Sequence, residues 1–217
     1  MHSQGQAPLP SNLRCMPATD DEIREKYLER AIRELNAFSR ELQACPHCPR
    51  GQLMPVLGSG HPQADIFLIK HSGRPSEVEE GVAFYGRTGN ALMKSLKRLA
   101  IDPLTVYGTL CVKCPVLDPA MADPACVARL VEELAIVAPK IVVVMGPDAL
   151  AVVNSELEIP LARSLEPSPG ELQRLTPSIE ALYVPSVDEA LDDEHAKREF
   201  WTAFRVLGQW WADLPPY

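Results

Sequence analysis

Short apolar runs that alternate with helical patterns constrain the fold of this chain most strongly. The runs are bounded by turn residues and read as buried strands at 64–69, 105–112, 140–145 and 181–184. Apolar residues at helical spacing follow at 90–99, 123–137, 148–153 and 193–211. The alternation predicts the α/β class, with a three-layer α/β/α arrangement around a central, mostly parallel four-stranded sheet.

The length and composition fit one domain of this kind. A chain of 217 residues with 46% hydrophobic content can bury a full core. Residues 1–18 are rich in Pro, Ser and Gln without periodicity, which predicts a mobile N-terminal arm before a single domain at 19–217. Thr19 and the acidic residues after it predict the start of a long amphipathic helix that ends at Cys45.

The charge and hydropathy patterns exclude some classes of protein. A net charge of −8 argues against a protein that coats nucleic acid through bulk charge, although local basic residues can still contact phosphates. No apolar run reaches the roughly 18 residues that a membrane-spanning helix needs, and the first residues lack a signal-peptide pattern. We therefore expect a soluble, cytoplasmic protein without a membrane partner.

The cysteines form a pattern typical of metal or cluster sites. Six cysteines occur, including Cys45–Cys48 and Cys111–Cys114 with the C-x2-C spacing, and in the cytosol such thiols stay reduced. One interpretation is a zinc site built from both pairs. However, 62 residues separate the pairs, against roughly 15–20 in a zinc ribbon. The alternative is an iron–sulfur cluster, with Cys111 as a small core residue.

The carboxyl ends of the predicted strands hold the candidate functional site, because ligands bind there in parallel sheets. The loops that follow the strands start near residues 70, 110, 146 and 185.

Four segments carry a resemblance to a known family. They are CPHC at 45–48, GVAFYGRTGNALMKSL at 81–96, TLCVKCP at 109–115 and VAPKIVVVMGPDAL at 137–150. In order and spacing they resemble the iron–sulfur type of uracil-DNA glycosylase, often called family 4, over about residues 21–209. The resemblance implies a uracil-DNA glycosylase-like fold and, as partner, DNA that contains a damaged base.

The resemblance also implies a cofactor and a base-binding residue. Family members hold a [4Fe-4S] cluster on four cysteines, which match Cys45, Cys48, Cys114 and Cys126; zinc remains the alternative. The aromatic residue that stacks on the flipped base matches Phe84.

Three positions depart from the family pattern. Where the family has a Gly-Glu-Ala-Pro-Gly loop this chain has residues 70–74, with His71 at the position of the acid. The base-reading asparagine is matched by Leu110, which cannot pair with a Watson–Crick edge. Asp188 lies at the position of the family's His-Pro pair. We expect His71 and Asp188 to be catalytic with exchanged roles, so that Asp188 orders water and His71 donates to the leaving base.

Basic residues surround the same loops. We expect Arg74, Arg87 and Lys113 to contact DNA phosphates. The function predicted is that of a divergent iron–sulfur DNA glycosylase of base excision repair, which flips a damaged base and hydrolyses its N-glycosidic bond. The alternative is a catalytically inert module on the same fold that binds a DNA lesion or an unidentified protein partner. An iron–sulfur electron carrier is a third possibility.

Overall fold

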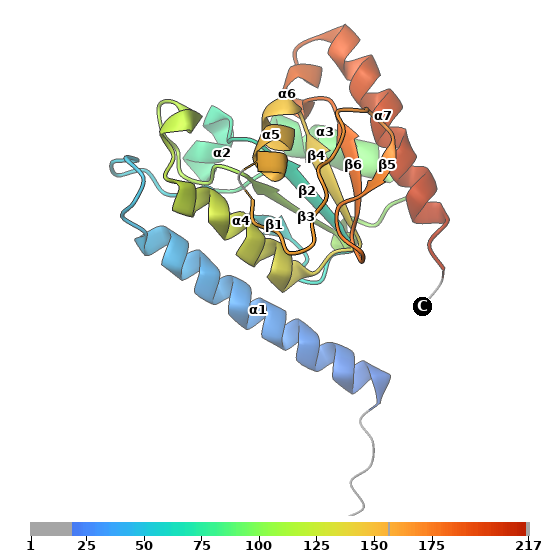
Figure 1. Ribbon diagram of the computed structural model, residues 1–217, viewed down its shortest axis with the longest axis horizontal. Helices are drawn as coiled ribbons and strands as arrows, with labels where there is room; N and C mark the ends of the chain where they lie inside the picture. Colours follow the sequence, from blue (N-terminus) through green and yellow to red (C-terminus); the bar gives the residue numbers. More distant parts are fainter. Residues whose placement is uncertain (1–18, 156, 216–217) are drawn as a thin grey trace, which may run out of the picture.

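The computed structural model describes residues 19–155 and 157–215, in which helices cover both faces of a six-stranded sheet (Figure 1). The predicted arm at 1–18 lies outside the described residues. The strands are β1 (Ser59–Gly60), β2 (Ile66–Lys70), β3 (Val106–Leu110), β4 (Ile141–Met145), β5 (Leu172–Arg174) and β6 (Glu180–Val184). The helices are α1 (Asp20–Ala44), α2 (Pro75–Glu80), α3 (Arg87–Arg98), α4 (Pro124–Val137), α5 (Pro147–Ser155), α6 (Val187–Ala190) and α7 (Glu194–Ala212), with short 3-10 turns η1 (Pro103–Thr105) and η2 (Pro119–Met121).

The sheet has the strand order β1-β3-β2-β4-β6-β5. The four predicted strands form its parallel centre, where β2 pairs with β3 and β4, and β4 pairs with β6. This confirms the predicted α/β class. Two short antiparallel strands, β1 and β5, extend the edges beyond the four predicted strands. With two and three residues they are too short to show a periodic apolar pattern.

The register of the parallel strands brings their carboxyl ends to one edge. Lys70 at the end of β2 lies opposite Leu110 of β3 and Met145 of β4. Met145 in turn lies opposite Val184 at the end of β6. The loops that begin after these residues therefore leave the sheet side by side.

Each central strand is buried on both faces, which explains its continuous apolar sequence. In β2, Ile66 and Leu68 pack into the core under α3 and α7, whereas Phe67 and Ile69 pack into the core under α4 and α5. Strand side chains alternate between the two faces, so a single five-residue run contributes to both cores.

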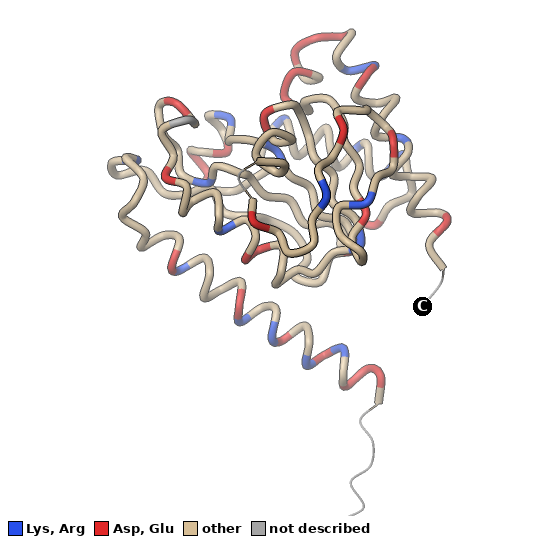
Figure 2. Tube along the Cα trace, in the orientation of Figure 1, with Lys and Arg blue, Asp and Glu red and all other residues tan. Residues whose placement is uncertain are grey.

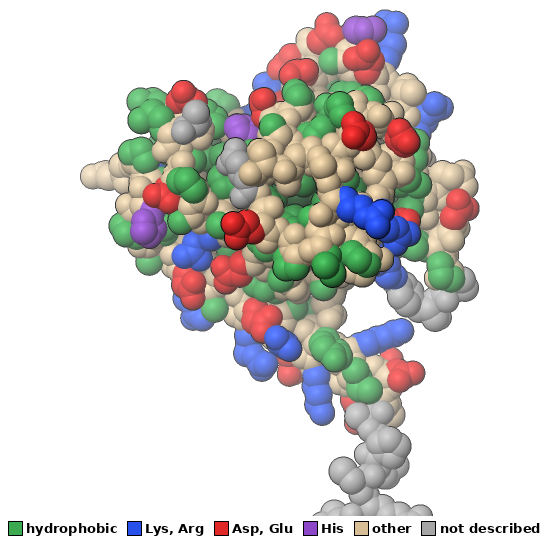
Figure 3. All heavy atoms as spheres, viewed as in Figure 1, with side chains coloured by type: hydrophobic (Ala, Val, Ile, Leu, Met, Phe, Trp, Pro, Cys, Tyr) green, Lys and Arg blue, Asp and Glu red, His purple; other side chains and the backbone are tan. Residues whose placement is uncertain are grey.

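Helix α1 begins at a capping box and then crosses the outside of α4. The Thr19 side chain accepts the Glu22 N–H, and the Glu22 carboxylate accepts the Thr19 N–H at 2.8 Å. Its buried residues, Ala31, Phe38 and Leu42, lie in the middle and later turns. The earlier turns project from the body with acidic and basic side chains along them, and with hydrophobic side chains among the charges (Figures 2 and 3). None of the helices in the described part of the chain is long and apolar enough to cross a membrane.

The loop predicted to start near residue 70 contains the short helix α2. Pro75 occupies its first turn, where the missing N–H costs no hydrogen bond. The Glu77 carboxylate accepts the Arg74 N–H at 2.7 Å and caps the helix, and Gly81 ends it with a left-handed φ of 75°. Six residues are too few for a helical period to be recognised in the sequence.

Candidate functional site

A small cleft lies at the carboxyl ends of β2, β4 and β6. It encloses about 120 Å³, well below the roughly 300 Å³ at the lower end of small-molecule pockets. His71 and Asp188, the two residues predicted to be catalytic, both line it. The complete lining is Lys70, His71, Ser72, Met145, Gly146, Pro147, Asp188, Asp148, Ser186 and Glu189.

The Asp188 carboxylate is held in place from several sides. Lys70 Nζ donates to its Oδ2 at 2.9 Å, and Thr88 Oγ1 donates to its Oδ1 at 3.1 Å. Arg74 Nη1 lies 3.9 Å from Oδ1 and donates to the Asp188 main-chain carbonyl at 3.0 Å. The side chain remains 28% exposed. These contacts fix the orientation of the carboxylate while part of it still faces the cleft.

Lys70 and Glu77 form a buried ion pair beside Asp188. Lys70 Nζ lies 2.5 Å from Glu77 Oε2, and the two side chains are 3% and 0% exposed. The other Glu77 oxygen accepts the Phe84 N–H at 2.6 Å. Lys70, Glu77 and Asp188 together are called the ion triad below. It joins the end of β2, helix α2 and helix α6.

Neither Lys70 nor Glu77 is predicted by the sequence pattern to belong to the site. A signal for Lys70 existed, since a lysine at the end of a strand buried on both faces needs a buried anion nearby. The sequence around Glu77 carries no pattern that marks it as that anion, because the six residues of α2 are too few to show a helical period.

Phe84, predicted to stack on a flipped base, lies against the sheet with a left-handed φ of 58° and 8% exposure. Its ring packs over Gly108, where an added Cβ would lie 2.5 Å from Phe84 Cδ2. Lys70 Nζ lies 5.7 Å from the centroid of the ring. Phe84 is not among the residues that line the cleft. The ammonium of Lys70 lies between this ring and the cleft, because it also donates to Asp188.

Arg74 and Arg87, predicted to contact phosphate, converge on Asp192. Arg74 Nη2 lies 2.9 Å from Asp192 Oδ2, and Arg87 Nη1 lies 3.1 Å from Asp192 Oδ1. The hydrogen bond from Arg74 is the main cause that lowers the pKa of Asp192. The Arg74 side chain is 31% exposed and that of Arg87 is 69% exposed, so both reach the surface.

The burial of Lys113 contradicts its predicted contact with a DNA phosphate. Lys113 was expected to contact phosphate, yet its side chain is 0% exposed and its Nζ lies 2.6 Å from Glu133 Oε2. The same ammonium donates to Thr109 Oγ1 and to the Leu110 carbonyl. The buried network uses the hydrogen-bonding capacity of the amine inside the protein, which is incompatible with a phosphate contact at the surface.

Three of the cysteines predicted as ligands meet in one cluster. The sulfur atoms of Cys48, Cys114 and Cys126 all lie within 4.8 Å of one another, and all three residues are buried. The Asp123 N–H also donates to Cys48 Sγ at 3.4 Å. Cys126 lies in the first turn of α4, which Asp123 caps, and Cys114 follows the end of β3. Three soft, convergent sulfur donors are a set that can hold a metal ion.

The close approach of these sulfurs shifts the pKa values of the three thiols in different directions. Hydrogen bonding by Cys114 lowers the pKa of Cys126 to about 5. The same interaction raises the pKa of Cys114, and burial raises the pKa of Cys48. One sulfur is therefore favoured as a thiolate, the form in which cysteine binds metals.

The remaining described cysteines lie apart from this cluster. Cys45 follows α1 directly and is 8% exposed, but its sulfur is not within the three-sulfur group. Cys111 is fully buried in the core under α4 and α5, the place expected if it is a core residue.

The chain is similar to a known protein family. A family model for the uracil DNA glycosylase superfamily matches residues 57–206. The matched range includes β2, β6 and the cleft between them, as well as Cys114 and Cys126. A search of curated proteins found no match.

Proposed function

This chain belongs to the uracil-DNA glycosylase superfamily, and we propose that it is a DNA glycosylase-like protein of base excision repair. In this proposal it binds DNA at the carboxyl edge of the sheet, accepts an extruded, damaged base and hydrolyses its N-glycosidic bond. The observation that carries the proposal is the shared cleft of His71 and Asp188, which follow two different strands of the sheet, β2 and β6.

The chemistry assigned to the cleft is hydrolysis of the bond between the sugar C1′ and the base nitrogen. In this scheme a water held by the Asp188 carboxylate attacks C1′, and Asp188 accepts a proton from it. The C1′–N bond breaks with its electron pair on the base, and protonated His71 donates a proton to the leaving base. The hydrogen bonds from Lys70 and Thr88 support this role because they orient Asp188.

We assign DNA contacts to the surface beside the cleft. Arg74 and Arg87 are proposed to bind phosphates in exchange for their contacts with Asp192, which is 52% exposed. Phe84 is proposed to stack on the base after Lys70 moves away from its ring. A cytoplasmic location fits reduced cysteines of this kind.

The proposed cofactor is a [4Fe-4S] cluster on Cys48, Cys114 and Cys126, with Cys45 as the fourth ligand. The buried three-sulfur group supports a metal centre, and the burial of Cys45 beside α1 is compatible with its recruitment. Such a cluster would supply a structural link between α1 and the sheet. Iron, sulfide and zinc analysis of anaerobically purified protein distinguishes the cluster from the zinc alternative. Protein with zinc and no iron would overturn the cluster.

A second candidate function is a module that binds a DNA lesion or a protein partner without cutting. The ion triad favours it, because Lys70 fills the space next to Phe84 and pairs with the carboxylate that would have to hold water. The small volume of the cleft also favours the module that binds without cutting.

Duplex oligonucleotides that contain uracil, hypoxanthine, xanthine or an abasic site separate the two functions. Strand cleavage after alkali of the duplexes that contain uracil, hypoxanthine or xanthine, lost in His71→Ala and in Asp188→Asn, supports hydrolysis; the duplex with an abasic site tests binding alone. His195→Ala, which removes an exposed histidine far along the chain on α7, should cleave like the wild type. Binding of a lesion without cleavage supports the inert module, and absence of both binding and cleavage contradicts the glycosylase and the module that binds a DNA lesion.

A further inference from the structure

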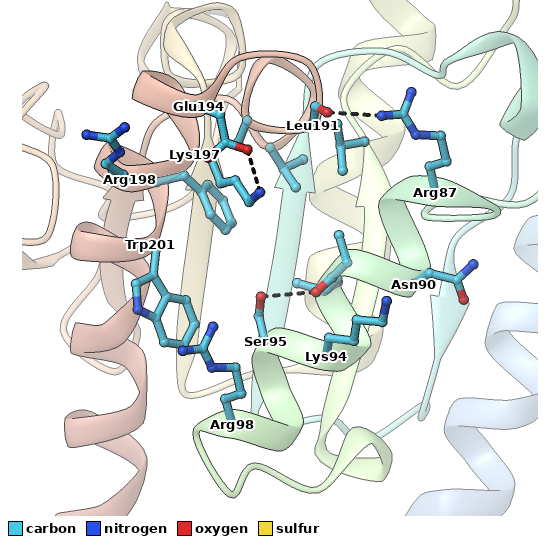
Figure 4. A pocket seen from close by; sticks show the side chains of 15 residues that line it. Arg87, Asn90, Lys94, Ser95, Arg98, Leu191, Glu194, Lys197, Arg198 and Trp201 are labelled. Carbon is cyan, nitrogen blue, oxygen red and sulfur yellow. Dashed lines mark hydrogen bonds and ion pairs between the residues drawn. The ribbon is translucent and has the colours of Figure 1, made fainter.

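A groove of about 690 Å³ lies between α3 and α7, beside the sheet and outside the cleft of His71 and Asp188 (Figure 4). It extends from Arg87 and Leu191, near the carboxyl edge of the sheet, to Arg98 and Trp201. Its volume lies within the roughly 300–1,000 Å³ typical of sites that bury a ligand. Among the residues that line it, Arg87 is the one with a part in the proposed function, as a phosphate contact at the end of the groove.

The floor of the groove is apolar. Leu92, Val187, Ala190 and Phe200 line it and belong to the core under α3 and α7, and the half-buried Trp201 extends it. A floor of this kind favours aliphatic or aromatic side chains of a partner, because burying them removes apolar surface from water.

The rim of the groove is basic. Five cationic side chains line it, and the single acidic one, Glu194, is already paired with Lys197 at 2.9 Å. The cationic residues are Arg87, Lys94, Arg98, Lys197 and Arg198. Within the described part of the chain, the side chains of Lys94 and Arg198 have no ion-pair or hydrogen-bond partner. Such an excess of positive charge stands out in a chain with a net charge of −8.

The cationic residues reach the groove from two helices, α3 and α7. Arg87, Lys94 and Arg98 are seven and four residues apart on α3, which puts them on one face. On α7, Lys197 and Arg198 lie one turn before Trp201, and Figure 4 shows Lys197 and Trp201 beside this space with Arg198 at its outer edge.

We infer that this groove binds an acidic peptide segment that carries apolar side chains. The carboxylates would pair with the rim, and the apolar side chains would occupy the floor. A nucleic-acid strand fits less well, because its phosphates would match the rim but its bases need a free aromatic face. The guanidinium of Arg98 lies 4.5 Å from the centroid of the Trp201 ring and occupies one face of it.

Fluorescence polarisation with the full chain tests this inference. The probe is a fluorescein-labelled hexapeptide in which aspartate and leucine alternate. We expect binding that weakens with added salt and that falls roughly tenfold in the double variant Lys94→Glu/Arg198→Glu. The matched control, Lys26→Glu/Arg33→Glu, makes the same charge change on exposed positions of α1 and should bind like the wild type.

Three further results decide the matter. Hexapeptides with asparagine for aspartate, or alanine for leucine, should bind more weakly if both rim and floor contribute. Equal binding by the wild type and the groove variant overturns the inference, as does absence of peptide binding. A labelled single-stranded oligonucleotide that binds more tightly than the peptide, and is lost in the groove variant, would assign the groove to nucleic acid instead. The peptide readout does not depend on base excision, so it stands or falls separately from the proposed function.

Discussion

Removal of the charge of Glu77 should destabilise the protein strongly. In Glu77→Gln, Lys70 keeps only Asp188 as an anion, although its own side chain is 3% exposed. The glutamine also replaces a carboxylate that accepts two main-chain N–H groups, from Arg74 and Phe84, with an amide that has one oxygen. Breaking a buried ion pair from one side typically costs about 3–5 kcal/mol.

The size of this effect can be measured directly. For a chain of this length about 2–4 °C of melting temperature corresponds to 1 kcal/mol, so Glu77→Gln should lower Tm by about 6–20 °C. Urea denaturation followed by tryptophan fluorescence gives the free energy of unfolding. The matched control is Asp192→Asn, which removes an acid from an exposed pair that solvent screens. Its Tm should stay close to that of the wild type.

A double variant isolates the cause. Lys70→Met/Glu77→Gln removes both charges of the buried pair, and it should recover part of the stability lost in Glu77→Gln. Unfolding of Glu77→Gln at the same urea concentration as Asp192→Asn would refute a stabilising role for the buried pair. A double variant less stable than the single one would refute it as well.

Three more changes have defined outcomes. Cys126→Ser removes a soft donor from the three-sulfur group, so bound metal should fall several-fold by elemental analysis; unchanged metal content would contradict the site. The pKa of Asp192 should lie below its usual value of 3.8 by NMR titration and should rise in Arg74→Gln. Because the pKa is lower in the folded protein, the contact stabilises the fold at a pH above the pKa of the unfolded chain. That stabilisation is lost as the pH falls through the pKa of the folded protein. Gly108→Ala places a Cβ against the ring of Phe84, so a loss of about 1–3 kcal/mol is expected in urea denaturation; full stability would contradict the close packing.

The ion triad links these experiments to the choice between the two functions. If Lys70 can leave Phe84 and Asp188 without unfolding the protein, the cleft can admit a base. A large loss of stability in Glu77→Gln would show that Lys70 depends on its buried partner, which favours the module that binds without cutting.

The elements of this fold could be predicted because their signals are local. A strand buried on both faces must be apolar along its whole length, and β2 and β4 are read directly from that requirement. The cap at Thr19 likewise places the start of α1 to within a residue. The short elements β1, β5 and α2 carry too few residues for a periodic pattern, so only the structure revealed them.

The chain's sequence alone determined the order of strands and helices, the edge of the sheet at which a site forms, and the cysteines available for a metal. Tertiary structure decided which of these residues meet. It paired Lys70 with Glu77 and Asp188, buried Lys113 against Glu133, and gathered three cysteine sulfurs while Cys45 stayed apart. The reason is physical: local patterns record how each segment buries its own surface, whereas a partner for a buried charge or thiolate comes from segments far away in the chain.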